Sequence, residues 1–210
     1  MDGKIGEASV HQGEPSTFWQ VAKQEFLRKF IHMASVLSIF VARYSEPLLI
    51  WGLAIITIIF IVGESIRLIL GGTSLITQLV ALVKRGSEDE RPALGPITLS
   101  LGIMSAFLLF PTVAARLAVA ALAFGDGIAS LVGRLFGRHR PKLLRGKSIE
   151  GSLSCFLVVL AASYVLTKGD LTTSFWVALL TTFIEALPLK SFDNLVIPLC
   201  VGFLSFRLGY

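Results

Sequence analysis

The stretch GDGIASLVGRLFGRHRPKLLRGKSIEG, residues 125–151, separates two long apolar runs of the chain. It opens with an acidic Gly-Asp pair, continues with spaced glycines and a basic run, and ends in Lys-Ser-Ile-Glu-Gly. A carboxylate, bare backbone and several cations are the groups that hold a metal–nucleotide complex. The apolar runs on either side predict that such a complex would lie against a lipid bilayer.

Composition places the chain among membrane proteins. Of its 210 residues 54% are hydrophobic, and the mean hydropathy is +0.75, above that of soluble domains. Several apolar runs approach the roughly 20 residues with which a helix crosses a bilayer, and strict two-residue alternation is absent. The sequence therefore predicts an all-α, polytopic integral membrane protein with about seven transmembrane helices.

The predicted spans follow from the apolar runs. They lie near residues 26–43, 47–70, 93–110, 111–124, 152–167, 171–187 and 195–208. The fourth is short, Pro111 marks a turn before it, and a separate helix from Asp126 to about Phe136 is expected after it. Residues 1–24 form a polar segment without a signal-peptide core, residues 71–91 a loop or surface helix, and residues 25–210 one membrane-embedded catalytic domain. Both cysteines are expected to be buried and unpaired.

The basic residues indicate the topology. With the N-terminus in the cytoplasm, 15 of the 19 Lys and Arg residues fall inside, and the other four are Arg43, Arg116, Lys168 and Arg207. This bias places segment 125–151 on the cytoplasmic side. Topology and anionic headgroups also account for the net charge of +5 without a nucleic-acid partner.

One helix face carries the first part of the polar segment. In a helix that begins at Asp126, the positions of Asp126, Ser130, Gly133 and Gly137 follow i, i+4, i+7 and i+11 and share one side. The carboxylate would bind a metal ion or cap the helix. The glycines would admit a nucleotide or a second helix.

The second part of the segment resembles a phosphate site. Its cations are Arg138, Arg140, Lys142 and Lys147, and Ser148 adds a hydroxyl. The spacing is not that of a GxxxxGK[ST] loop. Glu150 would bind Mg²⁺, cap the next helix together with Ser148, or pair with Lys147.

Further ionisable residues lie near the predicted cytoplasmic ends of the spans, where such groups are costly and often functional. They are Arg28, Lys29 and His32, then Glu64 and Arg67, then Glu185, and finally Asp193 with its neighbour Asn194. Structural roles remain open for four of them. Glu64 and Arg67 would pair at i, i+3, Asp193 would cap the last helix, and His32 would bond a neighbouring helix.

These motifs resemble a known family. The pattern GDGIASLVGRLFG…KSIEGS resembles the CTP-dependent lipid kinases, which include dolichol kinase, phytol kinase and the yeast-type CTP-dependent diacylglycerol kinase. The stretches RKFIH (28–32), ESIR (64–67) and DNLVIPL (193–199) resemble other motifs of this family. Phosphatidate cytidylyltransferases share the Gly-Asp core, but their Lys-Asp…Pro-Gly-His-Gly-Gly ending is missing here.

The resemblance implies a membrane kinase that moves the γ-phosphate of CTP to a long-chain lipid alcohol with Mg²⁺ as cofactor. The implied catalytic residues are Asp126, Lys147, Glu150 and Asp193, with Asp126 the first metal ligand and Glu150 and Asp193 candidates for a second. The implied nucleotide and phosphate site comprises Gly125, Ser130, Gly133, Gly137, Arg138, Arg140, Lys142, Ser148 and Gly151. The implied substrate mouth comprises Arg28, Lys29, His32, Glu64, Arg67, Glu185 and Asn194. Asp193, Glu185 and Asp126 compete as general base, and the acceptor alcohol stays open.

Three other functions remain as alternatives. The first is a phosphatidate cytidylyltransferase that makes CDP-diacylglycerol. The second is an ion-coupled transporter with Asp126, Glu185 and His32 along its path, although no internal repeat is visible. The third is a structural membrane protein whose basic segment binds anionic lipid, which would leave Asp126 and Glu150 without a role.

Overall fold

A computed structural model describes residues 26, 29–70, 93–141 and 146–210. Within these residues every regular element is a helix, as predicted. Helical residues 29–34 lead into η1 (Ser35–Leu37) and α2 (Ser38–Tyr44). The later elements are α3 (Glu46–Leu70), α5 (Leu94–Leu109), α6 (Thr112–Leu135), α7 (Ile149–Leu166), α8 (Leu171–Ala186), η4 (Lys190–Phe192) and α9 (Asp193–Arg207).

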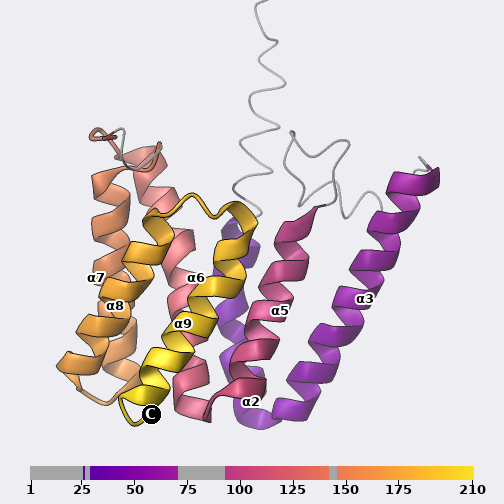
Figure 1. Cartoon of the computed structure of the whole chain (residues 1–210), viewed down its shortest axis with the longest axis horizontal. Helices are drawn as coiled ribbons and strands as arrows, with labels where there is room; N and C mark the ends of the chain where they lie inside the picture. Colours follow the sequence, from indigo (N-terminus) through magenta and orange to yellow (C-terminus); the bar gives the residue numbers. More distant parts are fainter. Residues whose placement is uncertain (1–25, 27–28, 71–92, 142–145) are drawn as a thin grey trace, which may run out of the picture.

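The helices run side by side between two ends of the molecule (Figure 1). At one end, called the polar end here, α6 finishes at Leu135, α7 begins at Ile149 and α9 begins at Asp193. The far end holds the turn between α7 and α8 and the C-terminal residue Tyr210. Segment 125–151 and the start of the last helix therefore lie at the same end.

Three helices are long and apolar enough to cross a membrane, and α5 and α8 are shorter apolar helices. The three are Glu46–Ile69, Thr112–Leu135 and Ile149–Leu166. Helix α3 leaves large side chains exposed along its length, with Trp51 at 69% and Ile56 at 61% exposure. Such a surface suits contact with lipid. These features are consistent with a membrane protein, while the number of spans and the orientation stay predictions.

The predicted helix start at Asp126 is wrong, and so is the short fourth span. Helix α6 runs without a break from Thr112 to Leu135, with Asp126 in its second half. The glycines on either side of Asp126 serve packing instead. A Cβ at Gly125 would lie 2.9 Å from Cγ2 of Thr181 in α8, and one at Gly127 would overlap the Met33 side chain. Asp126 is therefore not a helix cap.

The other predicted spans agree closely with the helices. The first is interrupted by the 3₁₀ turn of η1, and the last begins at Asp193, two residues earlier than expected. The cysteines Cys155 and Cys200 are both unpaired, as predicted, but only Cys155 is buried, and Cys200 is partly exposed. The predicted segments 1–24 and 71–91 fall outside the described residues.

Helix α6 lies at the centre because its side chains are small. It shares its most extensive contact with α7 and also packs on α9, α8 and α5. Fully or almost fully buried alanines line it at positions 114, 115, 118, 120, 121 and 123. Small residues let helix backbones approach closely, which drives packing inside a bilayer. Asp126 is thereby carried into the interior of the bundle.

A matched pair of glycines tests this packing. A Cβ at Gly102 in α5 would overlap the backbone carbonyl oxygen of Asn194, whereas one at Gly52 in α3 meets nothing within 4 Å. We expect Gly102→Ala to lower the free energy of unfolding by about 1–3 kcal/mol through overpacking. Gly52→Ala should be neutral or slightly stabilising. Thermal unfolding in detergent, followed by circular dichroism, measures both, and equal melting temperatures would contradict the close α5–α9 contact.

Asp170 gives a pH-dependent prediction at the far end. Its carboxylate caps α8 by accepting the Thr173 N–H at 3.1 Å and also accepts the Tyr210 hydroxyl at 3.0 Å. Hydrogen bonds from Thr173 above all hold the pKa of Asp170 below its ordinary 3.8. A lowered folded pKa means that this stabilisation exists above the unfolded pKa and is lost as the pH falls through the folded one.

We therefore expect acidification from about pH 6 to about pH 3 to lower the melting temperature more in the wild type than in Asp170→Asn, because the amide cannot titrate. Melting curves of both proteins across this range make the comparison. The same acid-induced shift in both would show that Asp170 does not contribute.

Candidate functional site at the polar end

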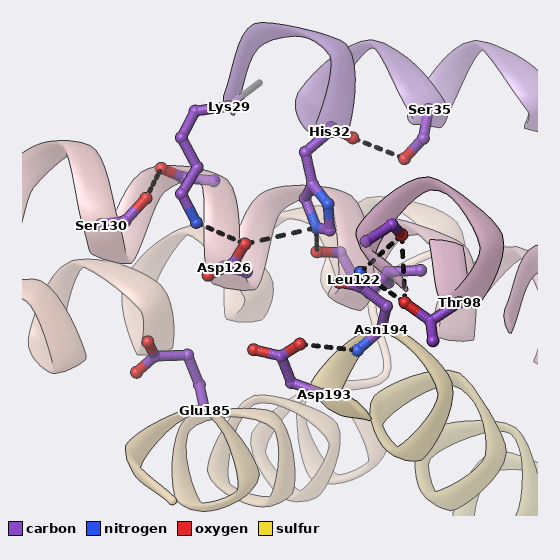
Figure 2. A network of polar contacts seen from close by, with 12 residues as sticks. Lys29, His32, Ser35, Thr98, Leu122, Asp126, Ser130, Glu185, Asp193 and Asn194 are labelled. Atoms are coloured by element: carbon purple, nitrogen blue, oxygen red, sulfur yellow. Dashed lines mark hydrogen bonds and ion pairs between the residues drawn. The ribbon is translucent and has the colours of Figure 1, made fainter. Parts of the chain in front are cut away.

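The N-terminal helical stretch is held to α6 by charged and polar contacts (Figure 2). Lys29 Nζ donates to Asp126 Oδ2 at 2.5 Å, and these side chains are only 10% and 16% exposed. His32 Nε2 lies 3.0 Å from the Leu122 carbonyl oxygen and 3.7 Å from Asp126 Oδ2. Because a carbonyl only accepts, Nε2 carries the proton. The RKFIH and Gly-Asp motifs therefore meet, while Arg28 lies outside the described residues.

A second ion pair joins the start of α7 to the end of α8. Lys147 Nζ lies 2.8 Å from Glu185 Oε1, with the lysine side chain 31% and the glutamate side chain 5% exposed. A buried carboxylate is costly unless a cation accompanies it. The ion pair thus links the KSIEG motif to the end of α8, which lies far from it in the sequence.

A third carboxylate belongs to the first turn of α9. Asp193 is only 9% exposed, and its Oδ1 accepts the N–H of Asn194 at 2.9 Å. The Asn194 side chain donates to the Gly95 carbonyl oxygen at 3.2 Å and to Thr98 Oγ1 at 3.1 Å. These bonds fasten the start of α9 to α5.

The carboxylates of Asp126, Glu185 and Asp193 face one space between α6 and the helices α8 and α9 (Figure 2). Asp193 also lies within electrostatic range of Lys29 and Lys147. The structure thus brings together three acidic and two basic side chains from five segments of the chain.

A cavity of about 240 Å³ opens beside this cluster. Its charged lining consists of Arg134, Arg140, Lys147 and Glu185, so cations outnumber carboxylates. The rest of the lining comprises Ala129, Ser130, Gly133, Gly146, Ser148, Gly151 and Ser152. Small residues, hydroxyls and cations together suit an anion with several oxygens.

Three glycines of segment 125–151 allow close backbone contacts beside the cavity. A Cβ at Gly133 would lie 2.9 Å from Ser148 Oγ, and one at Gly151 would lie 2.6 Å from the Ala129 carbonyl oxygen. A Cβ at Gly137 would overlap the Gly133 carbonyl oxygen. The glycines therefore let α6 and α7 approach each other, and Ser148 caps α7 by accepting the Gly151 N–H at 3.1 Å.

Loop residues after α6 fold back onto the cavity rim. Arg140 donates to the carbonyl oxygens of Gly133 at 2.9 Å and Gly146 at 3.1 Å. Glu150 Oε1 accepts the N–H groups of Arg138 and His139 and lies 2.8 Å from His139 Nδ1. Glu150 thus holds the loop and does not pair with Lys147. Lys142 lies outside the described residues.

Glu64 and Arg67 form the pair expected from their spacing, with contacts of 2.7 and 2.9 Å. Glu64 also accepts the Ala93 N–H at 2.7 Å, which ties the end of α3 to the start of α5. Neither residue lines the cavity. The pair therefore has a structural task at the polar end.

Carboxylates are too dispersed here for a metal site made of protein alone. Within residues 26, 29–70, 93–141 and 146–210, no three His, Cys, Asp or Glu side chains come close enough to hold an ion. A bound Mg²⁺ commonly takes one or two carboxylates and completes its shell with phosphates and water. The single Asp126 carboxylate beside a phosphate-sized cavity fits that second kind of site.

Four lining residues were not in the predicted site: Ala129, Arg134, Gly146 and Ser152. Arg134 follows Gly133 directly and Ser152 follows Gly151, so each neighbours a residue that was predicted. Their contribution depends on the distance between α6 and α7, which the sequence alone does not define.

Comparison with known proteins identifies relatives of the chain. It is 32% identical over 128 residues to the CTP-dependent diacylglycerol kinase 1 of Schizosaccharomyces pombe, covering 53% of this chain and 59% of that one. It is 29% identical over 164 residues to the probable chloroplastic phytol kinase of Zea mays, covering 69% and 54%. It is 30% identical over 122 residues to the phytol kinase of Synechocystis sp., covering 53% and 52%.

The chain thus spans between about half and three-fifths of the length of these relatives. No family model matches the sequence, and no solved structure matches it. The relatives carry names of one kind. Among the described residues, side chains from three of the motifs, Lys29, Asp126 and Asp193, lie close together at the polar end. The chain is similar to members of the CTP-dependent lipid kinase family.

Proposed function

We propose that this protein transfers the γ-phosphate of CTP to the hydroxyl group of a long-chain lipid alcohol, such as an isoprenoid alcohol or diacylglycerol. The observation that carries the proposal is the cation-lined cavity next to a buried carboxylate cluster at one end of an apolar helix bundle. The names of its relatives, phytol kinase and CTP-dependent diacylglycerol kinase, support this substrate class.

The cavity would hold the phosphate chain of the nucleotide. At about 240 Å³ it is smaller than the roughly 300–1,000 Å³ usual for a whole drug-sized ligand, so the base and ribose would extend outwards. Lys147 and Arg134 would contact phosphate oxygens, and Ser130 and Ser148 would donate hydrogen bonds. Arg140, which bonds two carbonyl groups, would shape the rim.

Asp126 would be the protein ligand of a Mg²⁺ ion that comes with the nucleotide. Such an ion neutralises charge on the phosphates during transfer. Lys29 holds the Asp126 carboxylate at 2.5 Å, and His32 anchors the same helix to the Leu122 carbonyl. In the proposed function, Lys29 and His32 hold Asp126 in position near the cavity.

The membrane would supply the acceptor. Its apolar tail would lie along the exposed apolar faces of the bundle while its hydroxyl group reaches the polar end. The excess of basic residues expected on the cytoplasmic side supports an orientation in which the polar end faces the cytoplasm.

Purified protein in detergent with Mg²⁺ and γ-labelled CTP tests the proposal directly. Phytol, polyprenol and diacylglycerol are supplied separately, and the labelled lipid is identified by chromatography. We expect label in one of these lipids and release of CDP. If instead cytidine label enters lipid from phosphatidate and pyrophosphate is released, the protein is a cytidylyltransferase and the proposal is wrong.

Two substitutions test the assigned site. Asp126→Asn keeps the volume but loses the carboxylate, and Lys147→Ala loses a phosphate contact and the partner of Glu185. We expect each to lower kcat/KM by at least roughly 100-fold, as removal of a group that stabilises transition-state charge does.

Matched controls lie at the far end: Asp170→Asn for the carboxylate and Arg43→Ala for the cation. Both should retain turnover close to that of the wild type. Normal turnover in Asp126→Asn or Lys147→Ala, with the fold intact by circular dichroism, would remove that residue from the site.

A further inference from the structure

Resting on the proposed function, we infer that Asp193 is the general base, and that the acceptor hydroxyl group binds between Asp193 and Asp126. The sequence offers three buried carboxylates for this task, Asp126, Glu185 and Asp193, and does not rank them. In the folded protein, the groups that each carboxylate contacts distinguish the three.

Two of the three carboxylates are neutralised. Asp126 lies 2.5 Å from Lys29 Nζ, and Glu185 lies 2.8 Å from Lys147 Nζ. The oxygen engaged in each pair, Asp126 Oδ2 or Glu185 Oε1, is therefore already occupied by an ammonium group.

Asp193 differs in its contacts. Among the described residues no Lys, Arg or His comes within ion-pair distance of it, and its one hydrogen bond is the Asn194 N–H to Oδ1. The second oxygen, Oδ2, accepts no hydrogen bond from that part of the chain. With only 9% of the residue exposed, water competes little for that oxygen.

The carboxylate is also fixed in position. Asn194 bonds α5 through Gly95 and Thr98, and the tight approach of Gly102 to the Asn194 backbone leaves α9 little room to shift. Asp193 lies in the first turn of α9. A general base has to be held in a fixed position from which it can accept the proton of its substrate.

The charges around Asp193 suit a neutral hydroxyl group. Asp126 of α6 and Glu185 of α8 lie near it (Figure 2), and Lys29 and Lys147 are within electrostatic range of it. Phosphate oxygens held by Lys147 would lie on one side of the hydroxyl group and Asp193 on the other. The site therefore has a carboxylate to accept the hydroxyl proton and a cationic side chain to bind the phosphate.

In the proposed step, the γ-phosphate passes from CTP to the alcohol. The alcohol oxygen forms a bond to the γ-phosphorus of CTP, and the bond from that phosphorus to the β,γ-bridging oxygen breaks. The electron pair of the broken bond leaves with CDP. The hydroxyl proton passes to Asp193 Oδ2, and from there to solvent after the products dissociate.

Asp193→Asn tests the inference, because the amide keeps the shape of the side chain but cannot take a proton. Two quantities are measured on the full-length protein in detergent with Mg²⁺: kcat for lipid phosphorylation, and the Kd of β,γ-imido-CTP, which cannot be cleaved at that bond. We expect kcat to fall by about 10²–10⁴-fold, the contribution usual for a general base. The Kd should stay within about threefold of the wild type, since Asp193 holds neither phosphate nor metal in this scheme.

Asp126→Asn and Asp170→Asn are measured in parallel. Asp126→Asn should weaken nucleotide binding as well as turnover, and Asp170→Asn should change neither. Normal kcat in Asp193→Asn would overturn the inference, and so would a loss of analogue binding as large as that of Asp126→Asn, which would make Asp193 a metal or nucleotide ligand. A wild type that transfers no label to any alcohol would instead reject the proposed function, and this inference with it.

Discussion

The ion pair between Lys29 and Asp126 is the contact on which the rest of the site depends. Asp126 lies inside a helix bundle, where an ionised carboxylate is costly without a cation beside it. Lys29 supplies that cation from the N-terminal helical stretch, and His32 fixes the same stretch to the α6 backbone. Gly127 allows Met33 to pack against α6, so the two helices are close enough for the pair to form.

Close packing of small residues makes this arrangement possible. The alanines of α6 bring four neighbouring helices near its axis, and Gly133 and Gly151 let α7 approach at the level of the cavity. The same residues that look in the sequence like a phosphate-binding glycine pattern are therefore packing residues first. They create the cavity indirectly, by letting Ser148 and Lys147 lie beside Ser130 and Arg134.

Charge pairing then gives similar residues different tasks. Glu64 with Arg67 fastens α3 to α5, and Glu150 with His139 holds the loop after α6, so both act as structural anchors. Glu185 with Lys147 borders the cavity, while Asp193 has a backbone N–H and no cation among the described residues. Chemically equivalent carboxylates thus differ in their partners, which is the basis for distinguishing metal ligand, phosphate partner and proton acceptor in the proposed mechanism.

The sequence by itself determined the helical, membrane-like class and most helix positions, because long apolar runs must satisfy their backbone hydrogen bonds within a helix. Local spacing was also enough to predict the Glu64–Arg67 ion pair, because its two residues lie about one helical turn apart. It was not enough at Asp126, which was predicted to begin a helix but lies within α6, where the glycines beside it contact α8 and Met33. Only the tertiary structure decided that Lys29 meets Asp126, that Lys147 meets Glu185, and that Arg134 lines the cavity. These contacts join segments distant in the sequence, and they depend on interhelical distances that no local pattern encodes.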